Sequence, residues 1–140
     1  MAYATEDDLI HRAGISEITQ IADRNGDMII DPEVIAAALS HADATINGYV
    51  GAKYDLPLLF VPDLLRTWAV SIARHVLHRD GAPDHVATDY KDAITGLKDV
   101  ARGLIALPDV AGNTPASAAG VHIACAPPEV FSARNLRGWR

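Results

Sequence analysis

Three pairs of adjacent proline and aspartate residues within residues 1–107 divide this part of the chain into helical segments, and they constrain its fold more than any other feature. The pairs are Asp31-Pro32, Pro62-Asp63 and Pro83-Asp84. Aspartate suits the N-terminal cap of a helix, and proline suits its first turn, where a missing N–H costs nothing. Apolar residues at helical spacing follow each pair. The pattern predicts three long helices, over residues 32–53 with a break near Gly51, from Pro62 to near Gly81, and from Pro83 to Gly103.

Two shorter helices are predicted before them. Thr5, followed by three acidic residues, is a helix start, and Gly14 is a left-handed stop. Ser16 is expected to cap the second short helix. Strand signals are weak and are confined to residues 104–107 and 121–125. The sequence therefore predicts an all-α fold, a small helical domain of two short and three long helices with an extended C-terminal arm.

The spacing of apolar residues also predicts the face that each helix buries. In the helix that opens at Pro62, the expected inward-facing residues are Leu64, Leu65, Trp68, Ala69, Ile72, Ala73, Val76 and Leu77. The segment before this helix, residues 54–61 (YDLPLLFV), is a connector that its proline keeps from being helical. An exposed apolar run is a liability, so residues 56–61 are expected either in the core or against a partner protein.

Acidic and basic residues are unevenly distributed along the 140 residues. Residues 1–107 hold sixteen acids and nine bases, a net charge of −7, whereas residues 108–140 carry +1. Four of the eight prolines fall in that last stretch, which shows no sustained helical period. We therefore expect a helical body, residues 1–107, and an extended docking arm, residues 108–140. The overall charge of −6 argues against a protein that grips nucleic acid through its phosphates.

An aspartate-rich turn between the second and third predicted helices resembles an incomplete EF-hand loop. Its candidate calcium ligands, at loop positions one, three, five and nine, are Asp23, Asn25, Asp27 and Asp31. The sixth position is Met28 rather than glycine, which argues against the sharp turn, and the twelfth is not glutamate. The signal for calcium is therefore weak. The alternative is a tight turn in which Asn25 and Gly26 take left-handed backbone and Asp31 caps the next helix.

No motif for catalysis is found. His75 and His78 share a helix face, but no carboxylate or cysteine stands at a companion spacing for a zinc site, so boundary histidines are the better interpretation. Ser71 lies one turn before His75 without an orienting acid, and Cys125 is expected to be a packing residue. Phosphate-binding glycine loops and HExxH are missing. We expect no enzyme, no metal or cofactor apart from the calcium alternative, and an intracellular protein without a signal peptide or membrane span.

The last fourteen residues, 127–140 (PPEVFSARNLRGWR), mix apolar and basic side chains. Apolar anchors on an extended basic segment are typical of an arm that docks on another protein. Docking on another chain is preferred over the alternative, in which the arm folds back onto its own body. The expected partner-binding residues are Phe131, Arg134, Leu136, Arg137 and Trp139.

Several short segments, in order along nearly the whole chain, carry a family resemblance. They are residues 3–9 (YATEDDL), 23–31 (DRNGDMIID), 46–49 (INGY), 54–58 (YDLPL) with 61–62 (VP), 73–78 (ARHVLH) and 130–134 (VFSAR) with Leu136. Together they resemble the Mu-like phage head–tail connector, or adaptor, family of small morphogenesis proteins. In that family the aspartate-rich turn is closer to a complete acidic loop, so Met28 departs from the pattern.

The resemblance implies a virion structural protein, a connector that forms a ring beneath the portal around the DNA channel and joins capsid to tail. The implied partners are the portal protein, a tail-proximal connector or tail terminator protein, and further copies of this chain, generally twelve in the ring. DNA would pass through without sequence-specific binding, and no membrane is involved. The implied location is the virion and, during assembly, the host cytoplasm. A calcium-responsive or dimeric helical protein-binding module is the alternative function.

Overall fold

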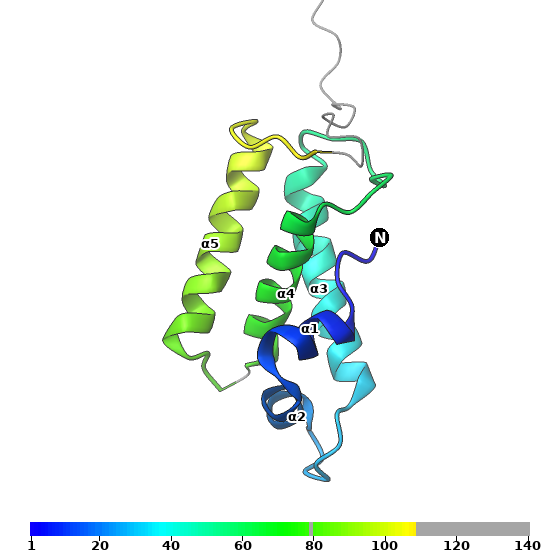
Figure 1. Ribbon diagram of the computed structural model, residues 1–140, viewed down its shortest axis with the longest axis vertical. Coiled ribbons are helices and arrows are strands. Elements are labelled where there is room, and N and C mark those ends of the chain that lie inside the picture. Colours follow the sequence, from blue (N-terminus) through cyan, green and yellow to red (C-terminus); the bar gives the residue numbers. More distant parts are fainter. Residues whose placement is uncertain (79, 109–140) are drawn as a thin grey trace, which may run out of the picture.

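The computed structural model describes residues 1–78 and 80–108, which form five helices (Figure 1). The helices are α1 (Glu6–Ala13), α2 (Ile15–Ala22), α3 (Pro32–Val50), α4 (Asp63–Leu77) and α5 (Asp84–Ala101). No strand occurs among these residues, including residues 104–107, where the sequence carries a weak strand signal. The predicted all-α fold with two short and three long helices is confirmed. The arm from residue 109 onward and the second strand signal lie outside the described residues.

Helix α4 occupies the centre of the described bundle. α3 and α5 pack on either side of it, and α1 contacts both α4 and α2 (Figure 1). Each of the five helices contributes side chains that are completely buried, among them Leu9, Ile18, Ile46, Leu65, Ile72 and Leu97. Together they form one apolar core. The short helices α1 and α2 are therefore part of the same packed body as the three long ones.

The residues before α1 are attached to α3. The backbone N–H of Tyr3 donates to the Asp43 carboxylate at 3.0 Å, and the Tyr3 hydroxyl donates to the Asn47 side-chain oxygen at 2.6 Å. Burial, with a smaller effect from the neighbouring Asp43 charge, raises the pKa of Tyr3 to about 12. These contacts fix the start of the chain against the middle of the bundle.

Two helix boundaries differ from the sequence-based expectation. α2 begins at Ile15 with Gly14 in the cap position, so Ser16 does not cap it; a φ of +86° lets this one glycine end α1 and begin α2. α3 ends at Val50, at the break predicted near Gly51, and does not continue to residue 53. The reason is that the Val50 carbonyl accepts the N–H groups of both Lys53 and Tyr54, which turns the chain back toward the core.

On α4, Leu64 and Val76 are exposed rather than buried as expected. The buried face of α4 contains Leu65 and Leu77, and a neighbouring residue in a helix lies about 100° around the axis. Leu64 and Val76 therefore fall at the edge of that face. None of the described helices combines the length and the apolar character that crossing a membrane requires.

The segment between α3 and α4, residues 51–62, lies beside the last described residues of the chain. Tyr54 is buried in this segment, and its hydroxyl accepts the backbone N–H of Leu107 at 3.1 Å. Leu107 is itself completely buried. The point at which the chain leaves the described body is thus attached to the base of the proline-containing loop.

Candidate functional site

The aspartate-rich loop, residues 23–31, forms a closed turn at the end of α2. The Asp23 carboxylate accepts the backbone N–H groups of Gly26 at 2.6 Å and Met28 at 2.8 Å, and these bonds lower its pKa. Met28 has a φ of +64°, in the left-handed region that usually favours glycine. Met28 takes the sharp turn in the absence of glycine, so the expectation that this residue argues against the turn is wrong. Hydrogen bonds from the loop backbone to Asp23 hold Met28 in that conformation.

Asp31 occupies the cap position of α3, as predicted, but its side chain has a different role. Its carboxylate accepts the Arg24 backbone N–H at 2.8 Å and makes no capping hydrogen bond to α3. Instead, the Asp31 backbone carbonyl accepts the N–H of Val34 at 3.1 Å. The carboxylate faces the loop, where the Arg24 N–H is its donor.

The structure thus brings Asp23, Asn25, Asp27 and Asp31 together, with their side chains bonded to one another or to loop N–H groups. The Asn25 amide donates to Asp27 at 3.1 Å, and the Asn25 oxygen accepts the Asp27 N–H at 2.9 Å. In residues 1–78 and 80–108, no group of three or more histidine, cysteine, aspartate or glutamate side chains is arranged to hold a metal ion. Calcium binding by this loop stays a prediction.

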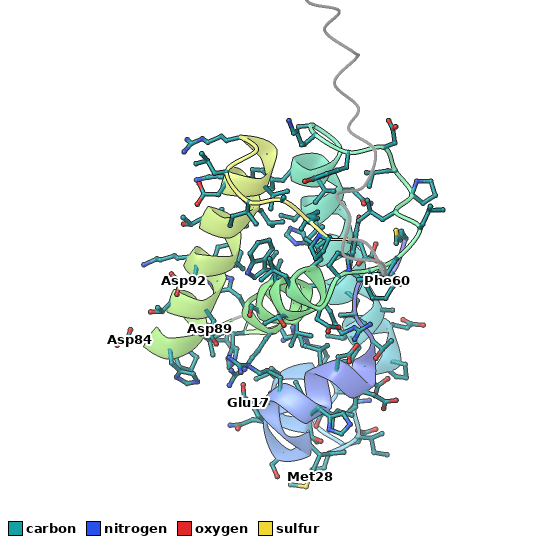
Figure 2. All side chains as sticks on the ribbon, turned by 45° about the horizontal axis from the view of Figure 1, so that its top comes forward. Glu17, Met28, Phe60, Asp84, Asp89 and Asp92 are labelled. Carbon is teal, nitrogen blue, oxygen red and sulfur yellow. The ribbon has the colours of Figure 1, made fainter. Side chains whose placement is uncertain are left out.

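Apolar side chains gather on the outer surface of this loop. Ile15, Met28 and Ile29 are 60%, 86% and 65% exposed, and we call these three residues the aspartate-loop patch. Ile15 and Met28 line one shallow depression of about 480 Å³, together with Ser16, Thr19, Gln20 and Asp23. Figure 2 shows Met28 at the extremity of the body. Exposed apolar clusters of this kind are typical of protein-binding surfaces.

A second exposed apolar cluster lies between α3 and α4. In the connector of residues 56–61, Leu58 is buried, whereas Leu56, Leu59 and Phe60 are exposed. We call Leu56, Leu59, Phe60 and the exposed Leu64 the proline-loop patch; Figure 2 labels Phe60. The sequence left two alternatives for this connector, burial in the core or exposure to a partner. Leu58 follows the first, whereas Leu56, Leu59 and Phe60 are exposed, as the second requires.

His78, at the C-terminal cap of α4, and His85 of α5 belong to an ionic network that residue spacing does not predict. The Arg74 guanidinium donates two hydrogen bonds to the Glu17 carboxylate, at 2.6 Å and 2.7 Å, and His78 Nε2 lies 3.3 Å from the same carboxylate. His85 Nε2 lies 3.3 Å from Arg74. The hydrogen bonds from Arg74, more than any other cause, lower the pKa of Glu17. Glu17 comes from α2, far from α4 in sequence, so residue spacing could not reveal it.

His75 and Ser71 have structural contacts. The His75 ring stacks on Tyr90 of α5 with 4.1 Å between ring centroids, and burial, followed by the nearby His78, lowers the His75 pKa. The Ser71 hydroxyl donates to the Thr67 carbonyl at 3.1 Å. Neither side chain is oriented for a joint reaction. Cys125 and the predicted partner-binding residues Phe131, Arg134, Leu136, Arg137 and Trp139 lie outside the described residues.

Comparisons with known proteins place this chain among phage proteins. Residues 3–124 match the family model described as "Bacteriophage Mu, Gp36". Gene product J of Escherichia phage Mu is 32% identical over 143 aligned residues, which cover 99% of each chain. The Mu-like prophage FluMu protein gp36 of Haemophilus influenzae is 37% identical over 105 residues, 75% of this chain and 74% of the relative. The similarity includes the whole described body.

Proposed function

Since the chain belongs to the bacteriophage Mu Gp36 family, we propose that it is a virion structural protein that acts as a head–tail connector. In this role it forms a ring, of twelve copies to match the portal, beneath the portal and around the DNA channel. Its partners are the portal protein on one side and a tail-proximal connector or tail terminator protein on the other. It acts by assembly rather than catalysis and needs no cofactor. It is found in the virion and, before that, in the host cytoplasm.

The observation that carries this proposal is the position of the two apolar patches. The aspartate-loop patch and the proline-loop patch lie near opposite ends of α3, a helix of nineteen residues and about 28 Å (Figure 1). None of the side chains of the two patches belongs to the apolar core of the described residues. A small body with an exposed apolar surface at each end offers the separate contacts that a subunit of a larger assembly needs.

The charge of the body supports a place next to DNA without a grip on it. Figure 2 shows Asp84, Asp89 and Asp92 along α5, and the body as a whole carries a net charge of −7. An acidic surface repels the phosphate backbone, so DNA in a channel of such subunits can slide. Proteins that bind nucleic acid through its phosphates carry a basic surface instead.

The proposal is tested by mixing this chain with the portal protein encoded in the same phage genome and examining the product by negative-stain electron microscopy. Rings of this chain bound to one face of the portal are the expected result. Persistent separation of the two proteins, with no co-elution on gel filtration, would contradict it. The portal is included because the experiment measures binding to it.

A pair of leucine variants then tests whether the proline-loop patch makes the contact. Leu59→Asp is expected to weaken portal binding by about tenfold or more, because it puts a charge into the centre of an apolar interface. Leu104→Asp, at an exposed leucine outside both patches, is the matched control and should bind as the wild type does. Equal losses in both variants would contradict a specific role for this patch.

A further inference from the structure

The aspartate-loop patch has the chemistry to receive the C-terminal arm of another copy of the same chain. We propose that residues 127–140 of one subunit dock on Ile15, Met28 and Ile29 of the next. This inference rests on the proposed ring and names the contact that holds neighbouring subunits together. It uses the surface at the opposite end of α3 from the proline-loop patch, which is left for the portal.

The patch combines exposed apolar side chains with acidic surroundings. Its depression is lined by Asp23 and by no basic residue, and the adjoining loop adds Asp27. Asp23 is partly exposed, and the hydrogen bonds from the Met28 and Gly26 N–H groups to its carboxylate lower its pKa. Ile15 and Met28, the apolar walls of the depression, lie too far out to contribute to the core of their own subunit.

The arm has the complementary chemistry. Residues 127–140 carry the large apolar side chains Phe131, Leu136 and Trp139, interspersed with Arg134, Arg137 and Arg140, against a single acid. Aromatic and arginine side chains are the usual anchors of protein interfaces. The arginines would face the aspartates at the rim, while the apolar anchors cover the isoleucines and the methionine.

The proline-loop patch lacks this complementarity. Acidic and basic residues flank it in equal number. The two acids are Asp55 and Asp63, and the two bases are Lys53 and Arg66. Such a neighbourhood gives a basic arm no electrostatic preference. Of the two exposed apolar patches, the aspartate-loop patch is the one whose charge fits the arm.

The length of the chain allows a contact between neighbours. The described body ends at Pro108, near the proline loop and away from the aspartate loop (Figure 1). The eighteen residues 109–126 span up to about 60 Å when extended, twice the length of α3. An arm that leaves one end of a subunit and binds near the other end of the next makes a head-to-tail contact. Contacts of that type generate rings when the rotation closes.

The test uses the full chain with a photo-crosslinking amino acid at position 139 in place of tryptophan. Copies labelled with nitrogen-15 are mixed with unlabelled copies, irradiated, and digested for mass spectrometry. Crosslinks between position 139 and a peptide containing residue 15, 28 or 29, with one partner of each isotope, are the expected result. Crosslinks only within one isotope would show self-docking and overturn the proposal, as would crosslinks elsewhere or none.

Two patch variants make the test specific. Met28→Gly removes the apolar side chain and at the same time relieves the left-handed backbone, so loss of the loop fold cannot explain a lost crosslink. It is expected to lower the crosslink yield by about tenfold, as is Ile29→Asp. Leu59→Asp, in the proline-loop patch, is the matched control and should leave the yield unchanged. An unchanged yield in Met28→Gly would overturn the proposal.

The outcome is separable from that of the proposed function. Crosslinking is measured on this chain alone, whereas the connector role is measured by binding to the portal. Binding to the portal without the expected crosslink would reject the arm contact and leave the connector role standing. The crosslink without portal binding would do the reverse.

Discussion

At the scale of single residues, Trp68 and Gly96 set how closely α4 and α5 approach. A Cβ atom built on Gly96 would lie 2.3 Å from the Trp68 ring, a distance that real carbon atoms do not tolerate. The tryptophan therefore uses the space that the missing side chain leaves. The glycine is kept in a helix in spite of its low helix propensity because the ring needs this space.

We expect Gly96→Ala to destabilise the protein by about 1–2 kcal/mol, because overpacking against Trp68 outweighs the gain in helix propensity. Gly48→Ala is the control. Gly48 is exposed within α3 and has no atom within 4 Å of its would-be Cβ, so alanine there should stabilise by about 0.5–1 kcal/mol. Urea denaturation of both variants measures the two effects. Changes of the same sign would contradict the packing argument.

The Glu17–Arg74 pair predicts how stability depends on pH. Because the folded-state pKa of Glu17 lies below its usual value of 4.5, the unfolded chain binds the proton more readily. The stabilisation is fully present above pH 4.5 and is lost as the pH falls through the lower, folded-state pKa. The free energy of unfolding, measured between pH 7 and pH 3, should therefore fall less steeply for Glu17→Gln than for the wild type.

Other acids do not confuse this comparison. The pKa values of Asp8 and Asp23 are also lowered, and both contribute equally in the wild type and the variant. Glu33→Gln, at an exposed carboxylate, is the matched control and should keep the wild-type slope. At pH 7 the Glu17 variant should also be less stable, because the buried Arg74 loses its charged partner. Identical slopes in all three proteins would disprove the assignment.

At the scale of elements, the two short helices begin in different ways. Thr5 caps α1 through a reciprocal pair of bonds: its hydroxyl accepts the Asp8 N–H, and the Asp8 carboxylate accepts the Thr5 N–H at 2.8 Å. Helix α2 has Gly14 in the cap position and no side-chain bond. A helix of eight residues depends on such contacts, since few internal hydrogen bonds stabilise it.

This contrast gives a direct test with two alanine variants. Thr5→Ala should lower the free energy of unfolding by about 1 kcal/mol, because it removes the hydroxyl that accepts the Asp8 backbone N–H and leaves that N–H without its partner in the protein. Ser16→Ala should change it by less than about 0.5 kcal/mol, because Ser16 lies inside α2 and caps nothing. Thermal unfolding followed by circular dichroism measures both. An equal cost for the two variants would favour Ser16 as the cap after all.

The elements were largely predictable because their signals are local. A proline–aspartate pair stands at the start of each long helix, and such a signal acts on the adjacent backbone. Gly14 ends α1 as predicted, but it also begins α2 in place of the predicted cap Ser16, because one glycine can serve both as the end of a helix and as the start of the next. Leu58 and Leu59 show where local information ends: they are neighbours of the same type, one buried and one exposed. Only the packed surroundings distinguish them.

The candidate site was less predictable than the helices. The aspartate loop was recognised from its spacing, but the left-handed Met28 was not, because hydrogen bonds to Asp23 determine it. The pairing of Glu17 with Arg74 joins residues 57 positions apart and depends on how α2 docks on α4. The spacing of apolar residues does not predict that Ile15 is exposed. Ile15 is the first residue of the short helix α2, where the buried face of the helix ends.

At the scale of the whole molecule, the arm and the body should be separable. Deleting residues 127–140 is expected to leave the helical circular dichroism signal unchanged and to prevent copies of this chain from joining in a ring. It should also remove any rise of the melting temperature with protein concentration, because contacts between copies disappear. Rings formed by the shortened chain would contradict the role of the arm, and loss of helix signal would contradict its separation from the body.

The bond between Leu107 and Tyr54 has a mechanical consequence. Tension on the arm would enter the body at Leu107, whose buried side chain and N–H are fixed to the base of the proline loop. To unwind α5 from its end, a pulling force must first extract this leucine from the core and break its bond to Tyr54. The force is then shared between the end of α3 and the loop, so the last turn of α5 is protected from unfolding.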